Sequence, residues 1–222
     1  MKKLLILTIT IFMLFQMTVY AAYPFDDVNE DDWYSEAVNY VYSNGLMTGT
    51  GSNQFTPDAN MSRAMLVTVL YSMEGKPSVF AVNPFADVAS SDYYYYPVVW
   101  AYENGIVAGT SATTFEPDNN ITREQMVAIF AKYAAYKGLK VSATANIDRY
   151  SDKLDVSAYA VDAFMWAVNA GIVSGTSKTT LSPQGTATRA QCAVIMRQFE
   201  RWSEEQKTDI ELPDIEDGAG WA

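Results

Sequence analysis

Three arginines stand in the same local sequence, and each could bind an anion. Arg63, Arg123 and Arg189 follow Ser or Thr and open an apolar stretch with helical spacing. A planar guanidinium can grip a carboxylate through two parallel hydrogen bonds. The first turn of a helix does not favour a cation, because the helix dipole is positive there. The pattern therefore predicts contact with a ligand carboxylate, helped by helix-start N–H groups, or an ion pair with a repeated acid: Asp27, Asp58, Asp87 or Asp118.

The arginines belong to a unit that occurs three times. Each unit has a Gly-apolar-apolar-x-Gly-Thr turn, then Phe/Leu-x-Pro, then the Ser/Thr-Arg pair. From the first copy to the second, the glycine, proline and arginine all shift by 60 positions (45→105, 57→117, 63→123). From the second to the third they shift by 66 (105→171, 117→183, 123→189). Constant offsets indicate an internal repeat.

Each unit is predicted to form a helix, a turn, a loop and a second helix. Asp32 is placed to cap the first opening helix, and glycines 45, 105 and 171 are placed to end the opening helices. The second helices are expected over about 62–73, 122–136 and 188–202, the last two with Thr–Gln capping boxes. One such helix pair buries too little surface to be stable alone. We therefore expect a mostly α domain of three helix-loop-helix repeats packed with pseudo-threefold symmetry.

Composition excludes several functional classes. The formal net charge is −11, with no histidine and a single cysteine, Cys192, which we expect in the core. Such an acidic chain does not attract nucleic acid or an anionic membrane. The lack of histidine removes Ser-His and Cys-His catalysis and His-ligated zinc. An acidic stretch at 26–32 lacks the glycine and glutamate of an EF-hand, so it does not indicate a calcium site. Taken together, these features lead us to expect no catalytic residues, no metal and no cofactor.

The ends of the chain differ from its middle in composition. Residues 1–21 have a basic start and an apolar run, which predicts a cleaved signal peptide rather than a retained anchor. Cleavage would leave a net charge of −11 − 2 = −13 and no segment that inserts into a membrane. Residues 203–222 are strongly acidic and are expected to form a disordered tail. Between them we place repeats at 22–82, 83–142 and 143–202.

The order of the motifs resembles the S-layer homology (SLH) repeat. Phe-x-Asp-Val, an early Trp, Gly-apolar-apolar-x-Gly-Thr, Phe-x-Pro-Asp and Thr-Arg-Ala-Glu/Gln follow one another, and the resemblance covers about residues 23–202. It implies a three-pronged helical module of bacterial surface proteins. Such a module binds a secondary cell-wall polysaccharide, often one bearing pyruvate ketals, in grooves between neighbouring repeats. The chain is then expected to be secreted and associated with the cell wall or S-layer.

The resemblance also implies a set of ligand-binding residues. The arginines would hold the ligand carboxylate, and their removal should then cost little stability. Trp33 could stack on a sugar or pack in the core, and the second glycine of each turn could let a sugar approach the backbone. The set is Arg63, Arg123, Arg189, Trp33, Asp27, Asp87, Gly49, Gly109, Gly175, Thr50, Thr110 and Thr176.

Departures from the repeat pattern limit what the resemblance implies. Met65 stands where Gln125 and Gln191 stand in the other repeats, and Gln184 replaces a repeated aspartate. The grooves should therefore be unequal, and those built on Arg63 and Arg123 are favoured. Two alternatives stay open besides wall anchoring. One is a small secreted wall hydrolase, for which no uncommitted segment is long enough, and the other is an adaptor that docks a protein partner through the acidic tail.

Overall fold

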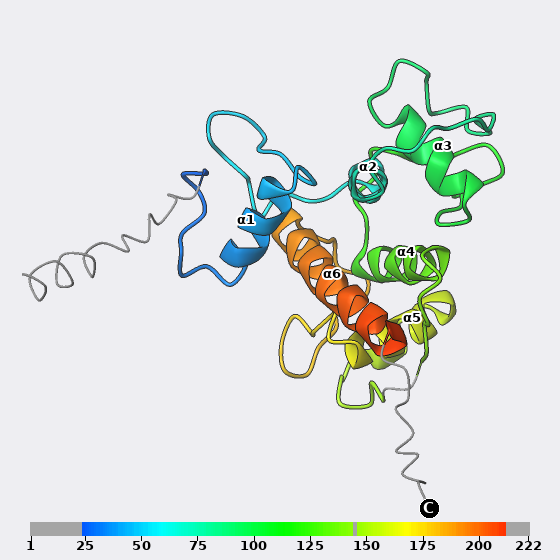
Figure 1. Ribbon diagram of the computed structural model, residues 1–222. Helices are drawn as coiled ribbons and strands as arrows, with labels where there is room; N and C mark the ends of the chain where they lie inside the picture. Colours follow the sequence, from blue (N-terminus) through cyan, green and yellow to red (C-terminus); the bar gives the residue numbers. More distant parts are fainter. Residues whose placement is uncertain (1–23, 144–145, 212–222) are drawn as a thin grey trace, which may run out of the picture.

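Six α-helices carry the fold. The computed structural model describes residues 24–143 and 146–211, in which two short 3₁₀ helices but no strand accompany the α-helices. The predicted signal peptide lies outside these residues. In chain order (Figure 1) the helices are α1 (Ser35–Ser43), α2 (Arg63–Met73), α3 (Tyr95–Glu103), α4 (Arg123–Tyr136), η1 (Lys153–Asp155), η2 (Ala158–Ala160), α5 (Val161–Asn169) and α6 (Arg189–Glu211).

The helices pair between repeats rather than within them. α3 packs on α2, α5 packs on α4, and α1 packs on α6 (Figure 1). Each pair joins the second helix of one repeat to the first helix of the next, and the pair of α1 and α6 closes the cycle. The predicted mostly α fold with three repeats is confirmed. Each repeat depends on both neighbours to bury its apolar faces.

A ring of three backbone hydrogen bonds marks the centre of the molecule. The N–H of Met61 donates to the carbonyl of Ala187 at 2.8 Å, and the N–H of Ala187 donates to Ile121 at 2.9 Å. The N–H of Ile121 donates in turn to the carbonyl of Met61 at 2.9 Å. All three residues are buried. Since equivalent positions of the three repeats bond one another in turn, the pseudo-threefold axis passes close to this ring.

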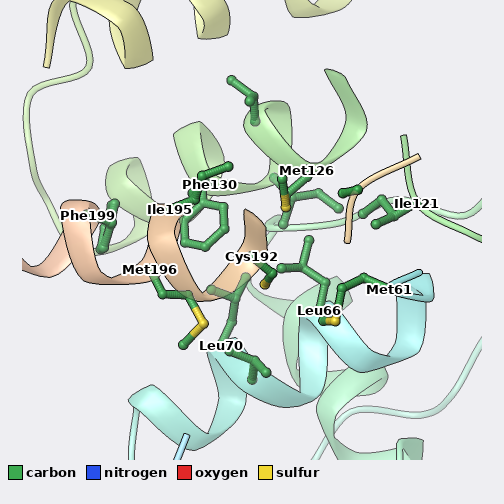
Figure 2. Packing of buried hydrophobic residues seen from close by; sticks show 14 of the residues in the cluster. Met61, Leu66, Leu70, Ile121, Met126, Phe130, Cys192, Ile195, Met196 and Phe199 are labelled. Atoms are coloured by element: carbon green, nitrogen blue, oxygen red, sulfur yellow. The ribbon is translucent and has the colours of Figure 1, made fainter. Parts of the chain in front are cut away.

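The second helices enclose the main core around that axis. Figure 2 shows side chains of α2, α4 and α6 converging, among them Leu66, Phe130 and Phe199, which are almost fully buried. Cys192 lies among them with no exposed surface, which confirms the prediction that it is a core residue. No helix in the described ranges is both long and apolar enough to cross a membrane.

Helix ends agree with the sequence predictions in part. Gly45, Gly105 and Gly171 have φ between +66° and +67° and follow the opening helices, as predicted, and both Thr–Gln capping boxes form. The prediction for Asp32 is wrong: its side chain accepts from the N–H of Asn29 at 2.7 Å, while α1 begins after Tyr34 without a side-chain cap.

The last helix is longer than the sequence predicts. α6 continues to Glu211 instead of ending near 202, so the first part of the expected tail is helical. The remainder of that tail, 212–222, lies outside the described residues.

Candidate functional site

Each repeat arginine crosses into the next repeat and binds its backbone. Arg63 Nε donates to the carbonyl of Phe115 at 2.9 Å, and its Nη2 donates to Ala108 at 3.2 Å. Arg123 makes the same two contacts with Leu181 (2.9 Å) and Ser174 (3.1 Å). The guanidinium groups therefore tie the loop and the turn of the neighbouring repeat together.

Arg189 repeats this arrangement and closes the cycle. Its Nε donates to the carbonyl of Phe55 at 2.8 Å, and its Nη2 donates to Thr48 at 2.6 Å, both in the first repeat. All three arginines are buried, with at most 8 % of their surface exposed. Burial lowers the pKa of each guanidinium, but arginine stays charged at any ordinary pH.

The predicted ion pairs between these arginines and the repeated aspartates are absent from the described residues. Asp27 instead accepts from the backbone N–H groups of Phe55 (2.8 Å) and Thr56 (2.7 Å) of its own repeat. Asp87 does the same with Phe115 (2.9 Å) and Glu116 (2.7 Å). Phe55 and Phe115 thus each accept a hydrogen bond from an arginine through the carbonyl and donate one to an aspartate through the N–H.

Asp152 completes this set in the third repeat, where Tyr150-Ser151-Asp152-Lys153 replaces the Phe-x-Asp-Val motif. It accepts from the N–H of Leu181 at 2.9 Å and of Ser182 at 2.7 Å. Both predicted site residues Asp27 and Asp87 therefore hold the loop that faces the arginine, and neither lines the two grooves described below.

The helix-start N–H groups are not available to an anion. Arg63 N donates to the carbonyl of Asn119 at 3.0 Å, and Ala64 N donates to Pro117 at 2.9 Å. The starts of α4 and α6 donate in the same way to the loops of the following repeats. The expectation that these N–H groups would help to bind a ligand is therefore wrong, because carbonyls of the neighbouring repeat already cap them.

Two grooves lie where a repeat arginine meets the next repeat. The first, which we call the Arg63 groove, has a volume of about 700 Å³. It lies between the turn at 106–110 and the exposed face of α4, with Gln125, Lys132 and Tyr159 in its walls. Its remaining surface is mainly Ala, Val and Ile side chains, so it combines an apolar bed with few polar groups, as small-molecule sites do.

The second, the Arg123 groove, has a volume of about 580 Å³. It lies between the turn at 171–176 and α6, and Trp33, Gln191 and Gln198 contribute to its walls. Gln191 also accepts a hydrogen bond from Arg123 Nη1 at 3.3 Å. Each of these two grooves is thus lined by one of the repeat arginines.

The arginines retain donors for a ligand in these grooves. A guanidinium has five N–H donors, and Arg63 uses its Nε and one Nη2 hydrogen on the neighbouring backbone. Arg123 uses the equivalent two and one more on Gln191. Both side chains line their groove, so each groove has in its wall a positive group with N–H donors that no described residue accepts.

The third equivalent position is built differently. Arg189 lies beside the turn of the first repeat, as its counterparts do in theirs. However, Met65 stands where Gln125 and Gln191 line the other two grooves, and it is exposed. An amide beside the arginine is thereby replaced by a thioether, which removes a donor and a good acceptor.

The second glycines of the turns have a packing role. A Cβ on Gly109 would lie 2.3 Å from the carbonyl oxygen of Ser111 and 2.6 Å from the ring of Phe85. Gly49 and Gly175 are equally enclosed, by Phe25 and Tyr150. The fold itself therefore requires glycine at these positions, because aromatic rings or backbone oxygens pack closely against the Cα. Gly109 and Gly175 also line the two grooves, so a role toward a ligand is compatible with this one.

The threonines of the turns close their loops. Thr50 and Thr110 hydroxyls each donate to a carbonyl four residues later, at 3.3 Å. Thr176 contacts the hydroxyl of Ser182 at 2.7 Å. Thr110 and Thr176 lie at the edge of the Arg63 and Arg123 grooves, whereas Gly49 and Thr50 belong to the turn beside Arg189.

The aromatic walls of the grooves come from equivalent positions. Trp33 is 67 % exposed, so it is not a core residue, and it faces the Arg123 groove. Tyr159, at the corresponding place in the third repeat, faces the Arg63 groove and was missed in the sequence. The offset of 66 from Tyr93 (93→159) would have found it.

Comparison with known proteins agrees with these features. The family model for the S-layer homology domain matches residues 24–64, 84–127 and 149–193. An endoglucanase of Bacillus sp. (strain KSM-635) is 30% identical over 79% of this chain and 18% of its own length. A surface-layer 125 kDa protein of Lysinibacillus sphaericus is 29% identical over 88% of this chain and 17% of its own.

A further similar protein is an S-layer protein of Bacillus thuringiensis subsp. finitimus, 29% identical over 82% of this chain and 22% of that protein. The chain therefore spans less than a quarter of the length of these relatives. What they share with it is the region of the three repeats and not the rest of the longer proteins. Because the family model matches three tandem segments that together cover more than half of its residues, this chain belongs to the S-layer homology domain family.

Proposed function

We propose that this protein anchors itself noncovalently to the bacterial cell wall by binding an anionic secondary polysaccharide in the Arg63 and Arg123 grooves. The observation that carries the proposal is a buried guanidinium in the wall of each groove, with N–H donors that no described residue accepts. Two relatives whose names describe surface-layer proteins support a location at the cell surface, either wall-bound or within an S-layer.

The ligand chemistry follows from the groups that line the grooves. The remaining N–H donors of an arginine in the wall of a groove favour a carboxylate over a diffuse polyanion, since these donors have fixed directions. Aromatic side chains beside it provide a face for a sugar ring. A pyruvate ketal on a sugar places a carboxylate and a methyl group next to the ring, and both match these walls. We therefore infer a pyruvylated polysaccharide as the ligand.

Co-sedimentation with purified sacculi tests the proposal. The protein is expected to pellet with intact walls and to stay in the supernatant after the polysaccharide is removed by mild acid. Walls whose polysaccharide lacks pyruvate should bind at least tenfold less. Undiminished binding to stripped walls would contradict the proposal and indicate peptidoglycan as the receptor.

The chain itself is proposed to be non-catalytic. Similarity to an endoglucanase covers only 18% of that enzyme, so the activity in that enzyme's name is not assigned to these repeats. We expect no release of reducing ends or free amino groups from walls incubated with the pure protein. Release of either would favour the alternative of a small wall hydrolase. A protein partner held through the acidic segment after 203 remains a second proposal, testable by pull-down with and without that segment.

A further inference from the structure

Glu124 is a buried acid that only the second repeat possesses. Its counterparts in the other repeats are Ala64 and Ala190, and it is 4 % exposed. Its carboxylate crosses to the third repeat, where it accepts from the backbone N–H of Ser157 at 2.9 Å and from the Ser157 hydroxyl at 2.8 Å. The hydroxyl of Tyr159 is its third donor, at 2.9 Å.

A second departure in the third repeat accompanies this one. Gln184 stands where the first two repeats have Asp58 and Asp118. These aspartates act electrostatically on Tyr34 and Tyr94 of their own repeats. Gln184 instead donates to the carbonyl of Asp155 at 3.0 Å. The third repeat thus has no acidic residue at the position of Asp58 and Asp118. The carboxylate that its Ser157 and Tyr159 contact is that of Glu124 in the second repeat.

The protonation states of the pair are defined by these contacts. Burial by itself would raise the pKa of Glu124, but the hydrogen bonds from Ser157, Tyr159 and Gln184 together outweigh it, so the pKa lies below its usual value. Burial and the bond to Glu124 raise the pKa of the Tyr159 phenol. At neutral pH an ionised carboxylate therefore accepts, and the phenol donates its single proton to it.

This arrangement determines what Tyr159 offers to the Arg63 groove. A phenol that has given its only proton to a carboxylate keeps lone pairs alone for further partners. Tyr159 is more than half exposed and lines the groove, so a ligand in the groove can contact this side chain. The corresponding aromatic of the Arg123 groove is Trp33, whose indole N–H can donate but not accept. The two aromatic walls have opposite hydrogen-bonding character.

We infer that Glu124 is a positioning residue that fixes Tyr159 as a hydrogen-bond acceptor, so that the Arg63 groove selects a saccharide presenting a hydroxyl donor beside its carboxylate. The inference rests on the proposed function of the grooves. It assigns the two grooves different preferences for the same polysaccharide chain, which would let one strand be recognised at chemically distinct points.

Site-resolved NMR titration tests this inference. The backbone amides of Gly109 and Gly175 report on the Arg63 and Arg123 grooves. The probes are a methyl 4,6-O-pyruvyl hexopyranoside and its 2,3-di-O-methyl derivative, which lacks hydroxyl donors. In the unmodified protein, methylation should weaken binding at Gly109 by about two- to tenfold, the value of one net hydrogen bond. At Gly175 methylation should have a smaller effect.

Two variants separate positioning from general stability. In Glu124→Gln the amide would donate to the Tyr159 oxygen and free the phenol proton, so discrimination at Gly109 should fall below twofold. Tyr159→Phe removes the acceptor and should abolish discrimination in the same way, with a side chain that is tolerated at an exposed position. Glu103→Gln, an exposed change at the end of α3, is the matched control and should leave discrimination intact.

The outcomes distinguish this inference from the proposed function. Binding at both reporters with unchanged discrimination in Tyr159→Phe overturns the inference alone, whether or not Glu124→Gln folds. If neither reporter shifts with either saccharide, the proposed function fails and the inference fails with it. Loss of discrimination at Gly109 only, with the same affinity at Gly175, supports both.

Discussion

Arg189 Nε, in the third repeat, lies 2.8 Å from the carbonyl oxygen of Phe55 in the first repeat. The contact joins the two ends of the repeat array, and the guanidinium also lies over the Phe55 ring at 4.4 Å. Equivalent arginines join the first repeat to the second and the second to the third. The repeated arginines therefore hold the interfaces between repeats, and any role in ligand binding is additional to this one.

The closing arginine is expected to stabilise the whole domain. Arg189→Ala removes two charge-assisted hydrogen bonds, one to the carbonyl of the buried Phe55 and one to the carbonyl of Thr48, and we expect the free energy of unfolding to fall by about 3 kcal/mol. Arg189→Lys should recover at most half of that loss, because an ammonium lacks the planar fork. Urea denaturation followed by circular dichroism measures both. Arg201→Ala, an exposed change in the same helix, should shift stability by less than about 0.5 kcal/mol.

Equal stability of Arg189→Ala and Arg201→Ala would contradict the role of this contact. The expectation from sequence, that such an arginine costs little to remove, is opposite in direction. That expectation assumed that the arginine has no buried partner. In the structure the guanidinium is buried and donates hydrogen bonds to backbone carbonyl oxygens. Every residue has a carbonyl, so a backbone partner leaves no trace in the pattern of side chains.

Other features of the fold were open to prediction from the printed sequence. Constant offsets revealed the three repeats, and the positive-φ glycines 45, 105 and 171 ended the helices as expected. The hydrophobic pattern could not reveal that α2 packs on α3 instead of on α1, because an apolar helix face does not indicate which other helix covers it. Tyr159 was within reach by alignment, but Glu124 was not, because an acid found in one repeat has no copy to compare with.

The turn glycines should tolerate no side chain. In Gly109→Ala the new Cβ would lie 2.6 Å or less from the ring of Phe85 and from two backbone oxygens. We expect a loss of about 1–3 kcal/mol, as in overpacked cores. Gly185→Ala is the matched control, since its Cβ would meet nothing closer than 3.3 Å. Thermal denaturation of both variants would contradict this account if their midpoints were the same.

Trp33 should matter for wall binding and not for stability. Its side chain is largely exposed in the Arg123 groove, and an aromatic contact is worth about 0.5–1.5 kcal/mol. Trp33→Ala is therefore expected to weaken co-sedimentation with walls by about two- to tenfold at an unchanged melting temperature. Phe80→Ala, which removes an aromatic that is 88% exposed and outside both grooves, should bind as the parent does. A Trp33→Ala protein with parental affinity would remove the Arg123 groove from the proposed site.

Wall binding should depend weakly on salt although the proposed ligand is anionic. With a net charge of −11, the protein repels a polyanion at long range, and added salt screens this repulsion. The same salt weakens the local contact between an arginine and a carboxylate, but burial of Arg63 and Arg123 shields it. Because the two effects oppose each other, affinity should change by no more than a few-fold between low and physiological ionic strength. Binding isotherms on walls at 20 and 150 mM salt would measure this, and a fall by orders of magnitude would instead indicate capture by a basic surface.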